Sequence, residues 1–193
     1  SHRSDMDQAK AKLEFVVRYC PPRQGWTVFV DVDASEEGRT GGVRKSPEAI
    51  LRQQRMRASA PVVLEDMRKA GVHVGARAKN WARCLGGRVL NLWGDRDIIA
   101  VDEKRSRLLI CEVEGVSSGQ PEQKVYRAVG QVVYALSRPS PDGFERWCVI
   151  AVSDEKLVTP LESLGALAIL GVTALWLGHS KAEDRPLFGP SLP

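Results

Sequence analysis

The chain is predicted to fold as an α/β domain in which helices flank a central mixed β-sheet. Three observations support this class. Short apolar runs typical of strands recur between helical patterns. After residue 75 these segments follow the order α-β-β-β-α-β-α-β. The chain has 193 residues, 43% of them hydrophobic and 27% charged, which is enough for one domain with a sizeable core.

The N-terminal part begins with an amphipathic helix, predicted over residues 8–19 and ended by Pro21 and Pro22. A strand over residues 26–32 follows, and a polar, glycine-rich loop leads from it to the next helix. Ser46 is suited to cap that helix, which is expected to end near residue 58. Pro61 begins a further helical pattern that ends near residue 69.

The rest of the chain supplies most of the predicted sheet. The expected elements are a helix over 76–85, strands over 88–92, 97–101 and 108–114, a helix over 121–137, a strand over 147–152, a helix ending near 170 and a strand over 172–177. We divide the chain into a core (61–180), a proline-rich tail (181–193) and an N-terminal helix/strand extension (1–60). The extension is either a layer packed on the core or an appended module.

The net charge of +4 is distributed unevenly. Residues 44–88 contain eleven lysines and arginines but three acids. A solvated helical face and a surface for a nucleic-acid backbone are both consistent with this run.

The four cysteines lie far apart and include no CxxC pair, which predicts free thiols in a reducing, intracellular compartment such as the cytoplasm, nucleoid or nucleus. The longest apolar stretch, residues 161–177, is interrupted by Glu162 and glycines. We therefore expect no membrane partner.

Acidic residues stand within two of the predicted strands, which a charged turn joins as a β-hairpin. Glu112 and Glu114 are two residues apart and therefore share a face of their strand. Asp97 lies on the preceding strand, so the three acids are expected to converge as a carboxylate cluster. Oxygen-rich clusters of this kind suit hard divalent cations. Without a cation or a lysine, the three charges would repel one another.

Three motifs in residues 75–136 resemble the core of the PD-(D/E)xK, or restriction-endonuclease-like, nuclease superfamily. The helix Gly75-Ala76-Arg77-Ala78-Lys79-Asn80-Trp81-Ala82-Arg83-Cys84-Leu85 is similar to the first helix of that core, Gly94-Asp95-Arg96-Asp97-Ile98-Ile99-Ala100 to its metal-aspartate strand, and Glu112-Val113-Glu114 to its ExK strand. The resemblance covers about 60 of the 193 residues. Within the superfamily, the stretch resembles in particular small bacterial nuclease-like proteins and archaeal Holliday-junction resolvases.

The chain departs from the family pattern at two reciprocal positions. Lys79 occupies the helix position of the family's glutamate, and Glu114 occupies the strand position of its lysine. The exchange leaves the local charge unchanged. A Lys79–Glu114 pair is then either a rearranged catalytic apparatus or a structural salt bridge. Lys124, on the next helix, is the alternative lysine.

The resemblance implies a site in which Asp97, Glu112 and the Val113 carbonyl hold Mg²⁺ or Mn²⁺. Glu114 would add a ligand or position a water, and Lys79 would stabilise developing charge. Gln131 resembles a family residue directed at the phosphate or at a metal-bound water; the alternative is a solvent-facing amide. Residues expected to contact nucleic acid are Lys124, Arg127, Ser117, Ser118, Arg77 and Arg83.

The function implied is a metal-dependent nuclease that hydrolyses DNA in processing, repair or restriction. The alternative is a catalytically inactive domain of the same fold that binds nucleic acid or a protein. RNA is a third substrate class. A homodimer is also implied, because many relatives work as dimers.

Overall fold

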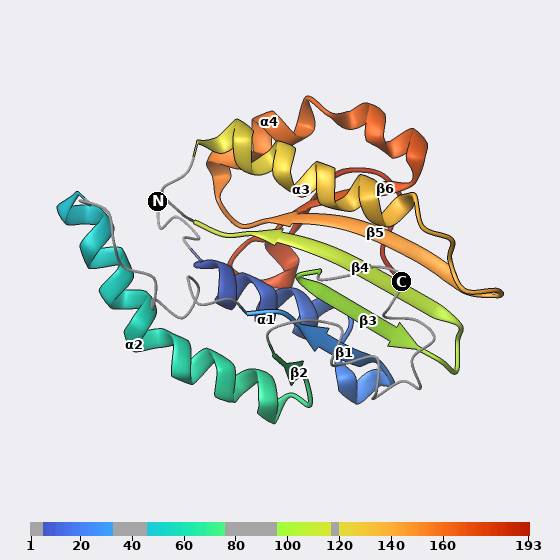
Figure 1. Cartoon of the computed structure of the whole chain (residues 1–193), viewed down its shortest axis with the longest axis horizontal. Coiled ribbons are helices and arrows are strands. Elements are labelled where there is room, and N and C mark those ends of the chain that lie inside the picture. The colour runs from blue at the N-terminus through green and yellow to red at the C-terminus, as the bar shows by residue number, and fades with distance from the viewer. Residues whose placement is uncertain (1–5, 33–45, 76–95, 117–119) are drawn as a thin grey trace.

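The computed structural model describes residues 6–32, 46–75, 96–116 and 120–193. A seven-stranded mixed sheet, in the order β2-β1-β3-β4-β5-β6-β7, lies between helices on its two faces (Figure 1). The predicted α/β class is therefore confirmed. The strands are β1 (Thr27–Val30), β2 (His73–Val74), β3 (Ile98–Asp102), β4 (Arg107–Glu114), β5 (Glu145–Val152), β6 (Val172–Trp176) and β7 (Arg185–Phe188).

Strand direction brings several strand ends to one edge of the sheet. The strands β4, β5 and β6 are parallel, so their carboxyl ends lie along the same edge. Strand β3 is antiparallel to both β1 and β4, and it begins at that edge. We call this edge the carboxyl edge of the sheet.

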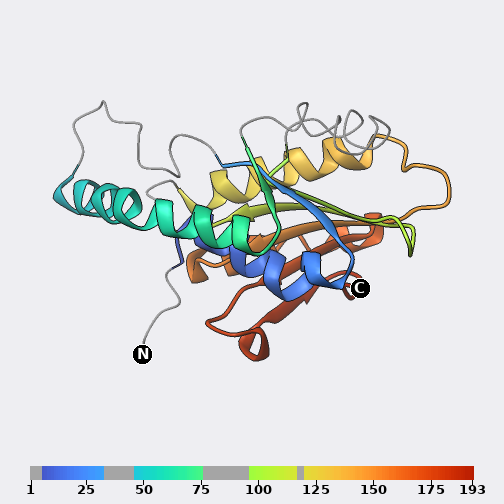
Figure 2. The ribbon, with the colours of Figure 1, turned by 90° about the horizontal axis from the view of Figure 1, so that it is seen from below.

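Two layers of helices bury the two faces of the sheet (Figure 2). Helix α1 (Gln8–Tyr19) packs on one face, where the core includes Phe15, Val28, Cys111 and Val149. Helices α3 (Pro121–Leu136) and α4 (Val158–Glu162) pack on the other. The alternating side chains of β4 and β5 therefore serve two separate cores.

Helix α2 (Pro47–Lys69) is continuous, whereas the sequence predicted two helices meeting near Pro61. A proline inside a helix costs about 3 kcal/mol, because it removes a hydrogen bond and crowds the preceding turn. The turns around Pro61 bury Ala60, Val63 and Met67, and α2 packs against α1. This burial, worth about 1.5–3 kcal/mol for each large side chain, offsets the cost.

The C-terminal helical segment also differs from its prediction. The chain forms a short α4 and then a 3-10 helix, Gly165–Leu170, instead of one helix ending near residue 170. Ile169 of this segment is 89% exposed, so it receives little stabilisation from packing. The helix predicted over 76–85 and the strand predicted over 88–92 lie outside the described residues.

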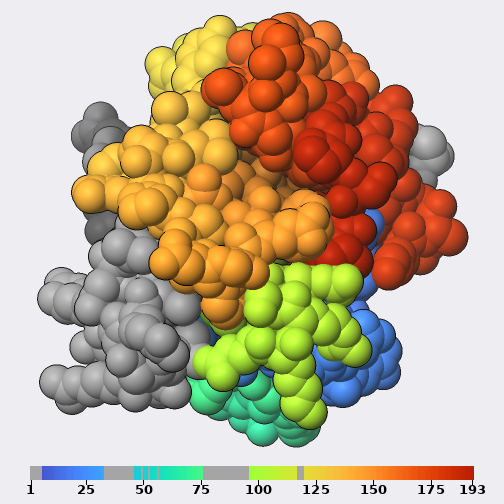
Figure 3. Space-filling view, turned by 90° about the vertical axis from the view of Figure 1, so that its right-hand side faces the viewer, coloured from blue at the N-terminus to red at the C-terminus, as the bar shows by residue number. Residues whose placement is uncertain are grey.

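Both terminal parts of the chain are integrated into the layers. Strand β1, from the predicted N-terminal extension, is an interior strand between β2 and β3. At the C-terminus, the Trp147 indole donates to the Ser191 carbonyl at 3.1 Å, and the Thr173 hydroxyl to the Pro190 carbonyl at 2.6 Å. Figure 3 shows the end of the sheet opposite the carboxyl edge, where the turn of the β3–β4 hairpin (green) lies beneath the α3–β5 connection (orange).

Within the part of the chain that the structure describes, no helix is both long enough and apolar enough to cross a membrane. The described cysteines, Cys20, Cys111 and Cys148, are buried free thiols.

Candidate functional site

Two of the predicted acids meet at the carboxyl edge of the sheet. Asp97 directly precedes β3, and the pairing of Ile98 with Cys111 places it beside Glu112 on β4. Glu112 is 2% exposed, and its carboxyl group hydrogen-bonds that of Asp97. The sheet thus holds two acids against each other in a largely dry environment.

Asp97 is held in place by both of its carboxylate oxygens. Oδ2 accepts a hydrogen bond from the Val113 amide at 2.8 Å. Oδ1 lies 3.0 Å from the ammonium nitrogen of Lys12. The first contact comes from the neighbouring strand and the second from helix α1.

Lys12 is a buried lysine that was not among the site residues predicted from the sequence. It is 1% exposed, and its ammonium group also donates to the Asp31 carbonyl at 2.5 Å. On α1 it shares the buried side with Ala9 and Val16, three residues before it and four after it. A lysine in the apolar stripe of an amphipathic helix is an unusual placement that could have identified it.

The pKa of Glu112 is raised from 4.5 to about 9. Burial is the main cause, and the negative charge of Asp97 adds to it. Arg96 opposes the shift, with its guanidinium 3.4 Å from a Glu112 oxygen. The same guanidinium donates to the Gln131 carbonyl of α3 at 3.1 Å. Glu112 is therefore mostly protonated at neutral pH.

Glu114 has a different cation. The ammonium of Lys124, on α3, lies 3.8 Å from a Glu114 oxygen and donates to the Gly115 carbonyl at 2.8 Å. Burial raises the pKa of Glu114, while the charges of Lys124 and Arg127 lower it. Lys124 thus reaches the second acid of β4.

Three acids and three cations make up this site: Asp97, Glu112, Glu114, Lys12, Arg96 and Lys124. Because Glu112 is mostly protonated at neutral pH, the cations outnumber the charged acids. A local excess of positive charge favours a phosphate group at the carboxyl edge.

The remaining predicted residues divide into two groups. Gln131 contacts the site through its backbone carbonyl, and Arg127 is exposed on α3. The others lie outside the described residues: Lys79, Arg77, Arg83, Ser117 and Ser118.

In the described parts of the chain, the site offers a metal ion one pair of contacting carboxyl groups, those of Asp97 and Glu112. Among the described residues, no group of three or more histidine, cysteine, aspartate or glutamate side chains is placed to hold a metal ion. Asp97 and Glu112 are nonetheless hard oxygen donors. The Val113 amide points to Asp97, and in a strand the carbonyl of the same residue faces the same side. Mg²⁺ is often held by one or two carboxylates together with substrate phosphates, so these donors fit it in kind.

The fold and the site together define an α/β protein with a buried cluster of acids and cations at the carboxyl edge of a mixed sheet. No family model, curated protein or solved structure matches the chain.

Proposed function

We propose that this chain is a metal-dependent nuclease that hydrolyses phosphodiester bonds in DNA. The observation that supports this most is the contact between the half-buried carboxyl group of Asp97 and the buried carboxyl group of Glu112, beside the buried ammonium of Lys12. Packing two acids together gains no stability, and strongly perturbed acids cluster at functional sites. The resemblance of these motifs to PD-(D/E)xK nucleases supplies the reaction class.

The residues of the site have separate roles in this proposal. Asp97, Glu112 and the Val113 carbonyl would hold Mg²⁺ or Mn²⁺, which supplies Lewis-acid polarisation of the phosphodiester and an activated water. Lys12 neutralises Asp97 and fixes its orientation. Lys124, which is 13% exposed at the side chain, offers a cation to the phosphate.

The test is cleavage of single-stranded, duplex and branched DNA, and of RNA, with Mg²⁺ or Mn²⁺. We expect the wild type to cleave DNA, and Asp97→Ala and Glu112→Ala to lose at least about a hundredfold in rate. Glu103→Ala, in the exposed turn of the hairpin, is the matched control and should keep full activity. Cleavage that survives both site substitutions contradicts the proposal, and cleavage confined to RNA contradicts its choice of substrate.

The second candidate is a non-catalytic domain of the same fold that binds nucleic acid or a protein. One observation favours it: each of the three acids already has a basic partner within 4.0 Å. Such a cluster is neutralised without a metal ion. Binding of DNA without any metal-dependent cleavage would support this candidate over the nuclease.

A further inference from the structure

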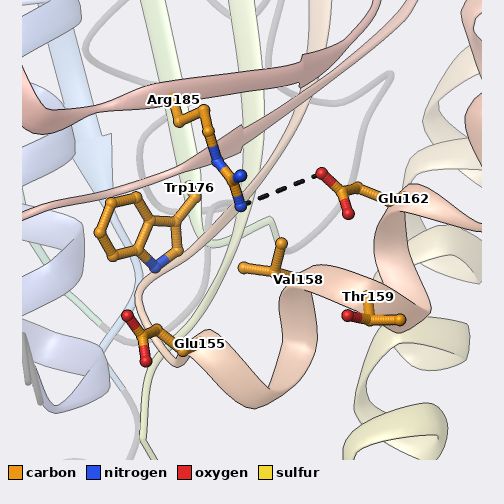
Figure 4. A pocket seen from close by; sticks show the side chains of 6 residues that line it. All are labelled: Glu155, Val158, Thr159, Glu162, Trp176 and Arg185. Carbon is orange, nitrogen blue, oxygen red and sulfur yellow. Dashed lines mark ion pairs between the residues drawn. The ribbon is translucent and has the colours of Figure 1, made fainter.

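A second feature of the carboxyl edge is a pocket of about 580 Å³ beside the site. It lies between the connection that follows β5 and the strands β6 and β7 (Figure 4). Its lining residues are Glu155, Val158, Thr159, Glu162, Trp176 and Arg185. Pockets at the carboxyl ends of parallel strands are the common ligand sites of α/β sheets.

The wall of this pocket contains an unsatisfied hydrogen-bond donor. The Trp176 indole nitrogen is buried without a hydrogen-bond partner, and it alone among the described buried side-chain polar atoms is in this state. In contrast, the Trp147 indole donates to Ser191. Leaving a donor unpaired costs about 1–3 kcal/mol, which a ligand offering an acceptor would recover.

The polar groups around Trp176 offer both signs of hydrogen bond. Figure 4 shows the indole nitrogen turned toward Glu155 and the Arg185 guanidinium reaching toward Glu162, at 3.9 Å. The carboxylates accept hydrogen bonds, whereas the guanidinium and the indole donate them. Two acids against one arginine disfavour a phosphate. A planar neutral ring with donors and acceptors on its edge is the better fit.

The sheet register connects this pocket with the site. Glu114 pairs with Val152 on β5, and Val152 pairs with Trp176 on β6. Residues paired in this way point to the same face of a parallel sheet. Glu114 and Trp176 are therefore two strands apart in one row, a separation of roughly 10 Å at the usual strand spacing.

We infer that this pocket binds a nucleobase of the DNA strand, unstacked from its neighbours and held beside the phosphate at the site. Trp176 donates its indole N–H to the base and contacts it with the edge of its ring, Glu155 and Glu162 accept from the base edge, and Arg185 donates to it. Guanine suits the carboxylates best, because it presents two adjacent N–H donors. This inference rests on the proposed nuclease function, since it identifies how the same substrate is positioned.

The test measures the binding of deoxyguanosine and thymidine, which carry no phosphate, without divalent cations. Indole N–H resonances of the ¹⁵N-labelled protein report the contact, and the Trp176 resonance is assigned by its loss in Trp176→Phe. We expect both nucleosides to shift this resonance, deoxyguanosine more strongly. The Trp147 resonance should not move, because that indole is bonded to the C-terminal tail.

Substitutions separate the two contributions of Trp176. Trp176→Phe keeps a ring but removes the donor, and should weaken nucleoside binding about 3- to 10-fold. Trp176→Ala also removes the ring contact with the base and should weaken nucleoside binding by at least about tenfold. Trp147→Phe is the matched control and should bind normally. Thermal unfolding of each variant establishes that it is folded.

Two results overturn the inference: nucleosides that leave the Trp176 resonance unmoved, or affinities that are equal in wild type and Trp176→Ala. Cleavage with Mg²⁺ is measured separately. An active enzyme whose KM and base preference are unchanged in both Trp176 variants contradicts the pocket while the nuclease proposal stands. Nucleoside binding without cleavage supports the pocket as a base site and contradicts the nuclease.

Discussion

Helix α1 contributes a buried cation to each of two ionic clusters, and the two clusters differ in how their acids are held. Arg18 joins Glu14 and Asp184 and also donates to the carbonyls of Gly178 and His179. The Tyr19 hydroxyl and the Gly178 amide donate to the Asp184 carboxylate. Each acid in this Arg18 cluster faces donors, with no second acid against it in the contacts described.

The pKa shifts separate the two clusters. Burial raises the pKa of Glu14, but hydrogen bonds and charges from Lys10 and Arg18 outweigh it, so the net shift is downward. At Glu112, burial and the charge of Asp97 raise the pKa to about 9. One cluster therefore stabilises the charged form of its acid, and the other opposes it. This difference supports the proposal that the Lys12 cluster, which is the group of acids and cations at the carboxyl edge, is the functional site of the two.

The largest expected effect on stability comes from removing the two cations. Arg18→Met leaves Asp184, whose side chain is 3% exposed, without its cation and should cost about 3–5 kcal/mol of unfolding free energy. Lys12→Met should cost less, about 2 kcal/mol, because Glu112 can share its proton with Asp97. Urea denaturation at pH 7 measures both. If Lys12→Met lost more unfolding free energy than Arg18→Met, Lys12 and not Arg18 would be the main structural cation.

Mn²⁺ should stabilise the Lys12 cluster and have no effect through the Arg18 cluster. At a hundred times its Kd, one bound ion adds about 2.7 kcal/mol. Since Glu112 is mostly protonated at neutral pH, binding should release a proton. Titration calorimetry at pH 7.5 in two buffers of different ionisation enthalpy measures the number of protons released on Mn²⁺ binding. Asp97→Asn should bind no ion, and binding without proton release would contradict the role of Glu112.

Glu112 and Glu14 should contribute to the free energy of unfolding with opposite pH dependences. Glu112 has a raised pKa, so its contribution to stability is complete below about pH 4.5 and is lost as the pH rises to about 9. Glu112→Gln should therefore gain roughly 1–2 kcal/mol over wild type at pH 8. Glu14 has a lowered pKa, so its contribution is present above pH 4.5 and is lost in acid. Denaturation of wild type, Glu112→Gln and Glu14→Gln from pH 3 to 9 measures both contributions. If the two substitutions changed stability with pH in the same direction, the two clusters would not differ in how they hold their acids.

The smallest effect is expected at the exposed margin of the Arg18 cluster. The Lys10–Glu14 pair spans 2.9 Å, but the Lys10 side chain is 43% exposed. Lys10→Ala should lower the unfolding free energy by at most about 0.5 kcal/mol. Thermal denaturation at low and at 0.5 M salt checks this, since salt should abolish the difference. A cost above 1 kcal/mol would show that Lys10 is part of the buried network.

Local patterns in the sequence were sufficient for the hairpin and its acids. Strands β3 and β4 lie within one residue of their predicted bounds, because alternation and turn residues are local signals. The approach of Asp97 to Glu112 follows from strand register. Lys12 was missed because Asp97 lies 85 residues away and only the packing of α1 brings the two together. Arg96 lies on the same hairpin as Glu112, but its contact with the Gln131 carbonyl depends on the packing of α3.

Helix boundaries were less predictable where tertiary packing decides them. Pro61 indicates a break, yet contacts of the following turn with α1 keep α2 continuous. The helix predicted over residues 76–85 lies outside the described residues, and among the described helices α1 delivers a lysine to Asp97. A helical pattern specifies which face is apolar, but not which strands that face will cover.

Strands β1 and β3 are antiparallel neighbours, and a long connecting segment of the chain joins them, from Asp31 to Asp97. The two ends of this segment are bonded to each other, because the Asp31 amide donates to the Asp97 carbonyl at 2.9 Å. The Lys12 ammonium group also contacts both residues, so it holds the two ends of the segment together. Any ligand that displaced these ends would loosen Lys12 from Asp97. By reciprocity, occupation of the site would tighten them. This segment and the carboxyl edge are in this sense thermodynamically linked through the Lys12 ammonium group and the Asp31–Asp97 backbone hydrogen bond.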